Sequence, residues 1–211
     1  MTEEKAFGRA LFFGLLGKVL YCNPTKEDLD QYISQNLFFD PPFAVENPDI
    51  SKGLSLLQEW ADRNREGLSA SEYDAICTDY LYLFVGVSVP EAPLWESGYF
   101  NDEGMLFQEE TLQVRAWYKK FGLACEKKNK EPDDNLGLEF EFLSKISLMI
   151  RGALISENFA EAKRLECASK EFLNEHPGRW VRQWSDLVRV HARTDFYRGV
   201  SFLAEGSLCV C

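Results

Sequence analysis

The residues best suited to chemistry form a short acidic segment that runs directly into an apolar one. Residues 131–135, Glu-Pro-Asp-Asp-Asn, precede the apolar run that begins at Leu136, and we call them the elbow. Their side-chain oxygens can accept hydrogen bonds from the N–H groups that a helix start leaves unpaired, or can pair with an arginine side chain. Because Pro132 suits the first turn of a helix, we expect Asp133, Asp134 and Asn135 in that turn. The elbow therefore predicts a capped helix start, which is the commoner arrangement, or the acidic wall of a binding site.

A second group of chemically distinctive residues lies in a segment without helical periodicity. Prolines and glycines interrupt the pattern between Gly86 and Gly104, yet Trp95, Tyr99 and Phe100 fall within it. If this aromatic loop (residues 90–100) lay beside the elbow, rings and carboxylates together would suit a peptide with an apolar stretch and adjacent arginines. The alternative is that Trp95 and Tyr99 fill the core beneath the loop, and we weigh the two interpretations equally.

The chain offers little for catalysis or metal binding. It has no phosphate-binding glycine loop, no nucleophile elbow and no dinucleotide fingerprint. Six scattered cysteines and two histidines complete no zinc pattern, so we expect no catalytic residues, no metal and no cofactor. His176 lies in Glu-His-Pro-Gly before a helix, where the composition favours a cap-region residue over a ligand contact.

Composition and charge narrow the possible partners. With 45% hydrophobic residues among 211, the chain can bury a substantial core. Lys and Arg number 23 against 34 Asp and Glu, and the resulting charge of −11 disfavours nucleic acid and favours a cationic ligand. The acidic start lacks the basic region of a signal peptide, and the run from Phe12 to Leu16 is too short to cross a bilayer, so we expect a cytoplasmic protein.

Apolar residues recur at helical spacing in nearly every segment, which predicts an all-α bundle of about nine to ten helices. Thr25 with Asp28 resembles a capping box, and Ser156 is expected to cap a later helix. Residues 136–142 alternate like a strand, but apolar residues continue at helical spacing to Ile150, so this segment is predicted to be helical. We expect a single domain over 1–211, with halves 1–125 and 136–211 joined by a hinge at 126–135.

Several segments resemble the TorD/DmsD family of chaperones, also called redox enzyme maturation proteins, with NarJ as a more distant relative. Residues 131–137, Glu-Pro-Asp-Asp-Asn-Leu-Gly, are similar to the family's Glu-Pro-x-Asp-His hinge motif. Residues 80–86, Tyr-Leu-Tyr-Leu-Phe-Val-Gly, are similar to its Leu-Phe-x-Gly run, and residues 93–99 resemble its Pro-x-x-(Gly/Glu)-Ser-x-(Tyr/Trp) loop. The chain departs from the family at Asn135, which replaces a histidine, and at Ser88, where some members have tryptophan.

The resemblance implies an all-α, non-enzymatic, cytoplasmic chaperone that binds the twin-arginine (Tat) signal peptide of a molybdenum-cofactor oxidoreductase until export can proceed. A NarJ-like chaperone for a reductase subunit without a Tat leader is the alternative. Weak guanine-nucleotide binding is associated with the family, but this sequence has no phosphate-binding motif. Both a monomer and a domain-swapped dimer are compatible with a hinge. Asparagine at 135 cannot titrate near neutrality as histidine does. The candidate signal-peptide-binding residues are Tyr80, Leu83, Phe84, Trp95, Glu96, Ser97, Tyr99, Glu131, Pro132, Asp133, Asp134, Asn135 and His176.

Overall fold

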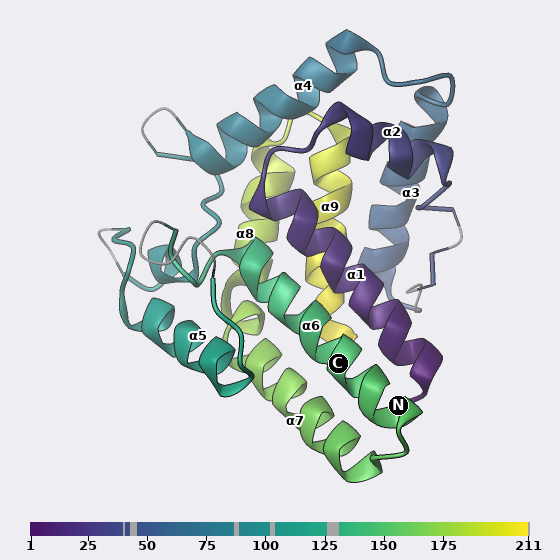
Figure 1. Ribbon diagram of the computed structural model, residues 1–211. Coiled ribbons are helices and arrows are strands. Elements are labelled where there is room, and N and C mark those ends of the chain that lie inside the picture. The colour runs from purple at the N-terminus through teal and green to yellow at the C-terminus, as the bar shows by residue number, and fades with distance from the viewer. Residues whose placement is uncertain (40, 43–45, 87–88, 102–103, 126–130, 211) are drawn as a thin grey trace. The chain divides into compact units, whose positions relative to one another are not determined.

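The computed structural model describes residues 1–39, 41–42, 46–86, 89–101, 104–125 and 131–210 (Figure 1). Within these ranges the chain forms nine α-helices and no β-strand, which confirms the predicted all-α class. Contacts group the helices into two compact units, one built from residues 1–21 and 94–180 and the other from residues 22–93 and 181–210. Each unit thus draws on both predicted halves, and a single domain over 1–211 stays a prediction. Residues 126–130 of the predicted hinge lie outside the described residues.

The first unit is built on the helix pair α1 (Glu3–Tyr21) and α6 (Leu136–Ile155), which lie side by side (Figure 1). Glycine lets the two backbones approach closely, since a Cβ atom added at Gly137 would lie 2.6 Å from the backbone nitrogen of Tyr21. Phe13 of α1 stacks on Phe140 of α6 with ring centroids 5.8 Å apart, and both rings are fully buried. This close apolar contact fixes the N-terminal end of α6, which directly follows the elbow in the sequence.

Two more helices of the first unit, α5 (Glu109–Lys120) and α7 (Phe159–Glu175), share an aromatic cluster with α6. The ring of Phe172 on α7 lies 4.5 Å from that of Phe142 on α6 and 5.7 Å from that of Trp117 on α5. A short 3₁₀ helix, η2 (Glu96–Tyr99), lies in the aromatic loop, and the boundary between the units falls within α8 (Pro177–His191). The cluster therefore holds α5 and α7 beside the elbow's helix.

The second unit is organised around α3 (Pro48–Arg63) and α9 (Asp195–Gly206). Gly53 and Gly199 allow their close approach, because a Cβ atom at Gly53 would lie 2.8 Å from the Gly199 carbonyl oxygen. The rings of Trp60 and Phe196 meet edge to face at 4.9 Å across this contact. The remaining elements of the unit are α2 (Lys26–Ser34), α4 (Ala70–Tyr80), the π-helical segment η1 (Leu81–Val85) and the 3₁₀ helix η3 (Ser207–Cys209).

Of the two helix caps predicted from the sequence, one is confirmed and one is wrong. The Thr25 side chain accepts a hydrogen bond from the Asp28 backbone N–H at 3.1 Å, so the predicted cap of α2 is confirmed. The prediction for Ser156 is wrong, because Ser156 ends α6 and its hydroxyl donates back to the Gly152 carbonyl at 2.7 Å. Asn158 caps α7 instead, accepting from the Glu161 N–H at 3.1 Å. Serine suits both ends of a helix, so its type alone could not separate them.

Candidate functional site

The elbow precedes its helix rather than forming the first turn. α6 begins at Leu136, and the Asn135 side chain caps it by accepting a hydrogen bond from the Gly137 N–H at 2.9 Å. The expectation that Asp133 and Asp134 lie in the first turn is therefore wrong. Their carboxylates are bound by other elements of the unit, which leaves the capping role to asparagine, one of the best N-cap residues.

Backbone hydrogen bonds join the elbow to residues 94–99 of the aromatic loop. The Leu136 N–H donates to the Leu94 carbonyl at 2.7 Å, and the Glu96 N–H donates to the Asp134 carbonyl at 3.0 Å. These bonds make an isolated antiparallel bridge between Trp95 and Asn135. The juxtaposition on which the binding-site hypothesis depended is thus present within the first unit.

Glu131 ties the side chains of the two segments together. Its Oε1 atom accepts hydrogen bonds from the Trp95 indole N–H at 2.8 Å and from the Asn135 amide at 3.1 Å. Glu131 and Trp95 are only partly buried, so this edge of the joined segments meets solvent. It is the part of the elbow that a ligand could reach without rearrangement.

Asp133 has an internal cation as its partner. Arg115 of α5 donates to Asp133 Oδ2 from Nε at 2.9 Å and from Nη2 at 2.6 Å, and Asp133 is 2% exposed. The hydrogen bond to this carboxylate raises the pKa of the Arg115 guanidinium. The Tyr118 hydroxyl donates to the Asp133 carbonyl at 3.0 Å, which adds a second link between α5 and the elbow. A ligand arginine could pair with Asp133 only by displacing Arg115.

Asp134 is fully buried, and both its side-chain oxygens accept short hydrogen bonds. Oδ1 accepts from the Thr111 hydroxyl at 2.6 Å, and Oδ2 accepts from the Ser97 backbone N–H at 2.8 Å. A buried carboxylate with both oxygens satisfied holds the segments around it firmly in place. Asp134 therefore fixes the aromatic loop against α5.

A second polar cluster lies beneath the aromatic loop, around the buried Glu96. Glu96 Oε2 lies 2.8 Å from His176 Nδ1, and Oε1 lies 3.4 Å from Arg179 Nη1. His176 is also buried, and the hydrogen bond fixes its ring at the start of α8. This arrangement agrees with the cap-region location predicted for His176 and also links it to the loop.

Glu139 of α6 is a buried carboxyl group beside this cluster. It is 0% exposed, and its carboxyl group interacts with the side chains of Glu96 and Trp180. Burial raises its pKa well above the usual range, and the nearby charges of Glu96 and Asp134 raise it further. A raised pKa favours the neutral, protonated form of this carboxyl group, which adds no further negative charge beside Glu96 and Asp134.

The aromatic residues of the loop divide between core and surface. The Tyr99 ring packs on Trp180 with centroids 4.8 Å apart, and burial raises the pKa of the Tyr99 hydroxyl. Phe100 is exposed, and the Arg179 guanidinium lies 4.0 Å above its ring. The core-filling interpretation therefore fits the packed ring of Tyr99 in part, since Tyr99 is half-buried, and Trp95, which is also half-buried, stays available for contact at the edge.

Three of the remaining predicted site residues, Tyr80, Leu83 and Phe84, belong to the second unit. Phe84 is fully buried among Tyr80, Tyr197 and Trp184, with centroids 5.3, 5.3 and 6.0 Å away. Leu83 is also fully buried. Pro132 is buried in the first unit, and Ser88 lies outside the described residues. Leu83 and Phe84 are therefore core residues of the second unit.

Four residues that the sequence reasoning passed over complete the arrangement: Thr111, Arg115, Glu139 and Arg179. Only Glu139 left a signal in the sequence. It occupies a position on the apolar stripe of α6 that otherwise carries Leu136, Leu143 and Ile146, and a charged residue on such a stripe predicts a buried carboxyl group. Nothing in the local pattern pairs Arg115 or Thr111 with residues 18 and 23 positions away.

Over the described residues, no group of three or more His, Cys, Asp or Glu side chains has the geometry to hold a metal ion. None of the helices in these ranges is long and apolar enough to span a membrane.

The chain is similar to a family of known proteins and to individual chaperones. A family model described as "Nitrate reductase delta subunit" matches residues 47–186. A TorD chaperone of Aliivibrio fischeri is 25% identical over 207 residues, which span 96% of this chain and 93% of that protein. A probable Tat proofreading chaperone DmsD of Haemophilus influenzae is 25% identical over 199 residues, 94% of this chain and 87% of that protein. A crystal structure of a putative redox enzyme maturation protein from Archaeoglobus fulgidus matches with a TM-score of 0.51 at 18% identity, covering 92% of this chain and 90% of that one.

These matches define an all-helical chaperone rather than an enzyme. The chain belongs to the nitrate reductase delta subunit family, which includes the TorD and DmsD chaperones. The structural match supports the fold of redox enzyme maturation proteins.

Proposed function

We propose that this chain is a chaperone that binds the twin-arginine signal peptide of a molybdenum-cofactor oxidoreductase in the cytoplasm and retains it until export can proceed. The observation that carries the proposal is the likeness to a TorD and a DmsD chaperone over more than nine tenths of the chain, the latter named for Tat proofreading. The negative charge of −11 supports it, since a leader with two arginines is attracted to an acidic protein.

The joined elbow and aromatic loop supply a surface of the right chemistry. Trp95 and Glu131 offer an indole ring and a carboxylate at its solvent edge. An apolar stretch can pack on the ring while an arginine pairs with the carboxylate. Asp133, Asp134, Glu96 and His176 contribute by holding this edge in place, because each is buried and bonded to a neighbouring element.

Calorimetric titration with a twin-arginine leader peptide tests the proposal. We expect saturable binding to a leader encoded near this gene, and much weaker binding when both arginines are replaced by glutamine. Failure to bind any such leader would contradict the proposal.

Asp134→Ala should weaken leader binding more than Glu161→Ala. Asp134 holds Thr111 and Ser97 together, whereas Glu161 is half-buried on α7 and pairs with Arg164 at 2.7 Å. Circular dichroism must first show that both variants keep their helices. Equal affinities for the two folded variants would remove the elbow from the site.

A second candidate function is assembly of a reductase subunit that has no Tat leader. The family description, which names a nitrate reductase subunit, favours it. Purification of the chaperone from cells together with its catalytic partner would separate the candidates, since the partner either carries a twin-arginine leader or lacks one.

A further inference from the structure

A groove of about 330 Å³ runs between α5 and the C-terminal end of α7 in the first unit. Its lining residues come from two elements: Gln113, Ala116, Trp117 and Lys120 from α5, with Glu175 and His176 where α7 ends. His176 is the one residue that it shares with the predicted signal-peptide-binding set. The groove therefore adjoins the polar cluster beneath the aromatic loop but opens on α5.

One side of the groove is a rigid aromatic wall. Trp117 is partly exposed and is held edge to face against the buried Phe172, with centroids 5.7 Å apart. Phe172 in turn packs on the His176 ring at 4.9 Å, and His176 is fixed by its bond to Glu96. A fixed indole face at the edge of a groove is the best of the aromatic surfaces for holding a cation.

The Trp117 ring already holds a cation of its own chain. The Lys120 ammonium lies 4.3 Å from the ring centroid, one turn along α5. No ion pair with a carboxylate involves Lys120 among the described residues. A lysine on a flexible stem can move aside at little cost, so the indole face can be released to a ligand.

The end of α7 adds a negative charge to the lining of the groove. Glu175 is exposed, and no cation pairs with its carboxylate within the described ranges. Gln113 adds an amide that can hydrogen-bond to a ligand. A carboxylate and an indole ring that line the same groove suit a planar guanidinium, which can stack on the ring and donate to the carboxylate.

We propose that this groove binds an arginine side chain of the client peptide, with Trp117 stacking on the guanidinium and Glu175 accepting its hydrogen bonds. The inference rests on the proposed function for the identity of the client. Lys120 occupies the guanidinium's place in the free protein, so it competes with the ligand. The groove thereby gives the leader a pairing carboxylate that Asp133 and Asp134, each with internal partners, do not offer.

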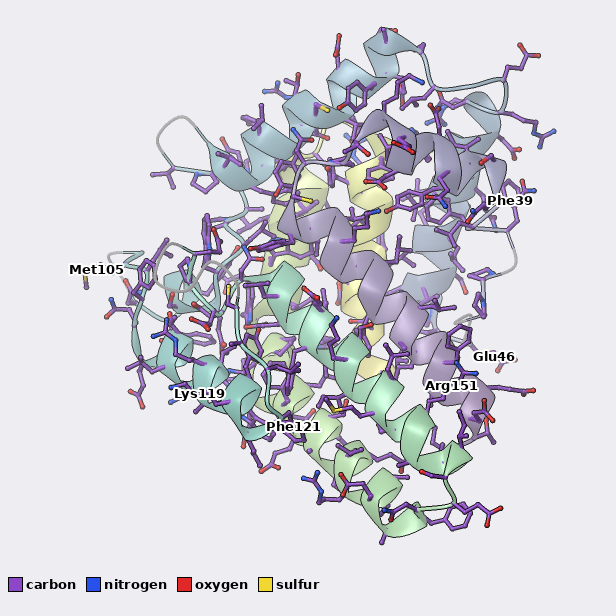
Figure 2. The ribbon with its side chains drawn as sticks, in the orientation of Figure 1. Phe39, Glu46, Met105, Lys119, Phe121 and Arg151 are labelled. Atoms are coloured by element: carbon purple, nitrogen blue, oxygen red, sulfur yellow. The ribbon has the colours of Figure 1, made fainter. Side chains whose placement is uncertain are left out.

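Titration of the full chain with a twin-arginine leader tests the groove through three substitutions and two matched controls. Glu175→Gln and Trp117→Leu should weaken binding about three- to tenfold. Lys120→Gln should tighten it about two- to fivefold, because the competing cation is gone. Glu171→Gln on the exposed face of α7 and Lys119→Gln on α5 make the same charge changes outside the groove. Figure 2 labels Lys119 near the end of α5, with Phe121 just beyond it.

A second measurement keeps the groove testable without the leader. Addition of N-acetyl-arginine amide should shift the Trp117 indole N–H signal in NMR spectra saturably, and Glu175→Gln should weaken this response. If the leader binds but every groove variant behaves as its control does, the groove inference is overturned and the proposed function stands. If the leader fails to bind while the arginine amide shifts Trp117, the proposed function fails and the groove stands. An arginine amide response that is absent, or unchanged by Glu175→Gln, also overturns the groove.

Discussion

At the scale of single residues, Glu139 makes a prediction about stability and pH. Its pKa in the folded protein is raised above the reference value of 4.5 by burial and by nearby negative charge. A raised folded-state pKa means that its contribution to stability is fully present below the unfolded pKa and is lost as pH rises towards the folded one. Glu139→Gln keeps the neutral shape without titrating, so the variant should gain on the order of 1 kcal/mol over the native protein between pH 5 and pH 8.

Urea unfolding of both proteins at pH 5 and pH 8 measures this difference. Glu141→Gln is the matched control, because Glu141 lies exposed on the same helix. If the free energy of unfolding of the native protein changed with pH as that of Glu139→Gln does, the pKa of Glu139 would not be raised in the folded protein.

Asn135 allows a second prediction at this scale. Its side chain both caps α6 and donates to Glu131, whereas Asn158 caps α7 from an exposed position with one such bond. Asn135→Ala should cost about 2 kcal/mol and Asn158→Ala about 1 kcal/mol, because loss of a buried cap also leaves a neighbouring polar group without its partner. Thermal unfolding compares them, and equal losses would mean that the link to Glu131 adds no stability.

At the scale of elements, the contact between α1 and α6 depends on the absence of a side chain. A Cβ atom at Gly137 would lie within 2.8 Å of backbone and side-chain atoms of Tyr21. At Gly152, on the same helix, a Cβ atom would meet nothing within 4 Å. Gly137→Ala should therefore destabilise the protein by about 2 kcal/mol or more, while Gly152→Ala should stabilise it by about 0.5–1 kcal/mol. Opposite signs in urea unfolding support the close contact, and a neutral Gly137→Ala would contradict it.

The elements themselves could largely be predicted from the sequence, because helical periodicity records which face of a segment is buried. The segment from Leu136 illustrates this, since its alternating start suggested a strand and its length decided for a helix. The start of α6 could not be placed as well. Asp133, Asp134 and Asn135 all have cap chemistry, and the choice among them depends on Arg115, Thr111 and Ser97, which lie 18, 23 and 37 positions away.

The candidate site could be predicted only in part, because the contacts that build it join residues far apart in the sequence. The binding-site hypothesis requires the elbow and the aromatic loop to be neighbours, and the bridge between Trp95 and Asn135 brings them together. The internal partners of the elbow's carboxylates leave no local pattern in the sequence, so the sequence predicts only that Asp133 and Asp134 cap the helix or face a ligand. Which residues contact a signal peptide stays a prediction.

At the scale of the whole molecule, chain order did not predict the compact units. Each unit joins two segments that are distant in the sequence, such as residues 1–21 with residues 94–180. Pairing of α1 with α6 requires a match of glycines and aromatic rings more than 100 positions apart, which periodicity within one segment cannot reveal. The net charge, in contrast, is a property that the sequence states completely.

That charge makes a prediction about how a client arrives. A protein of charge −11 attracts a cationic leader over distances comparable with the screening length, which falls from about 10 Å at 0.1 M salt to about 3 Å at 1 M. Stopped-flow measurements should show that the association rate falls about tenfold over this range, while the dissociation rate changes less. A leader with both arginines replaced by glutamine should show a weaker salt dependence. Glu175→Gln changes the net charge by only one unit, so this substitution should mainly raise the dissociation rate. If the association rate did not change with salt concentration, the electrostatic attraction would be confined to the groove.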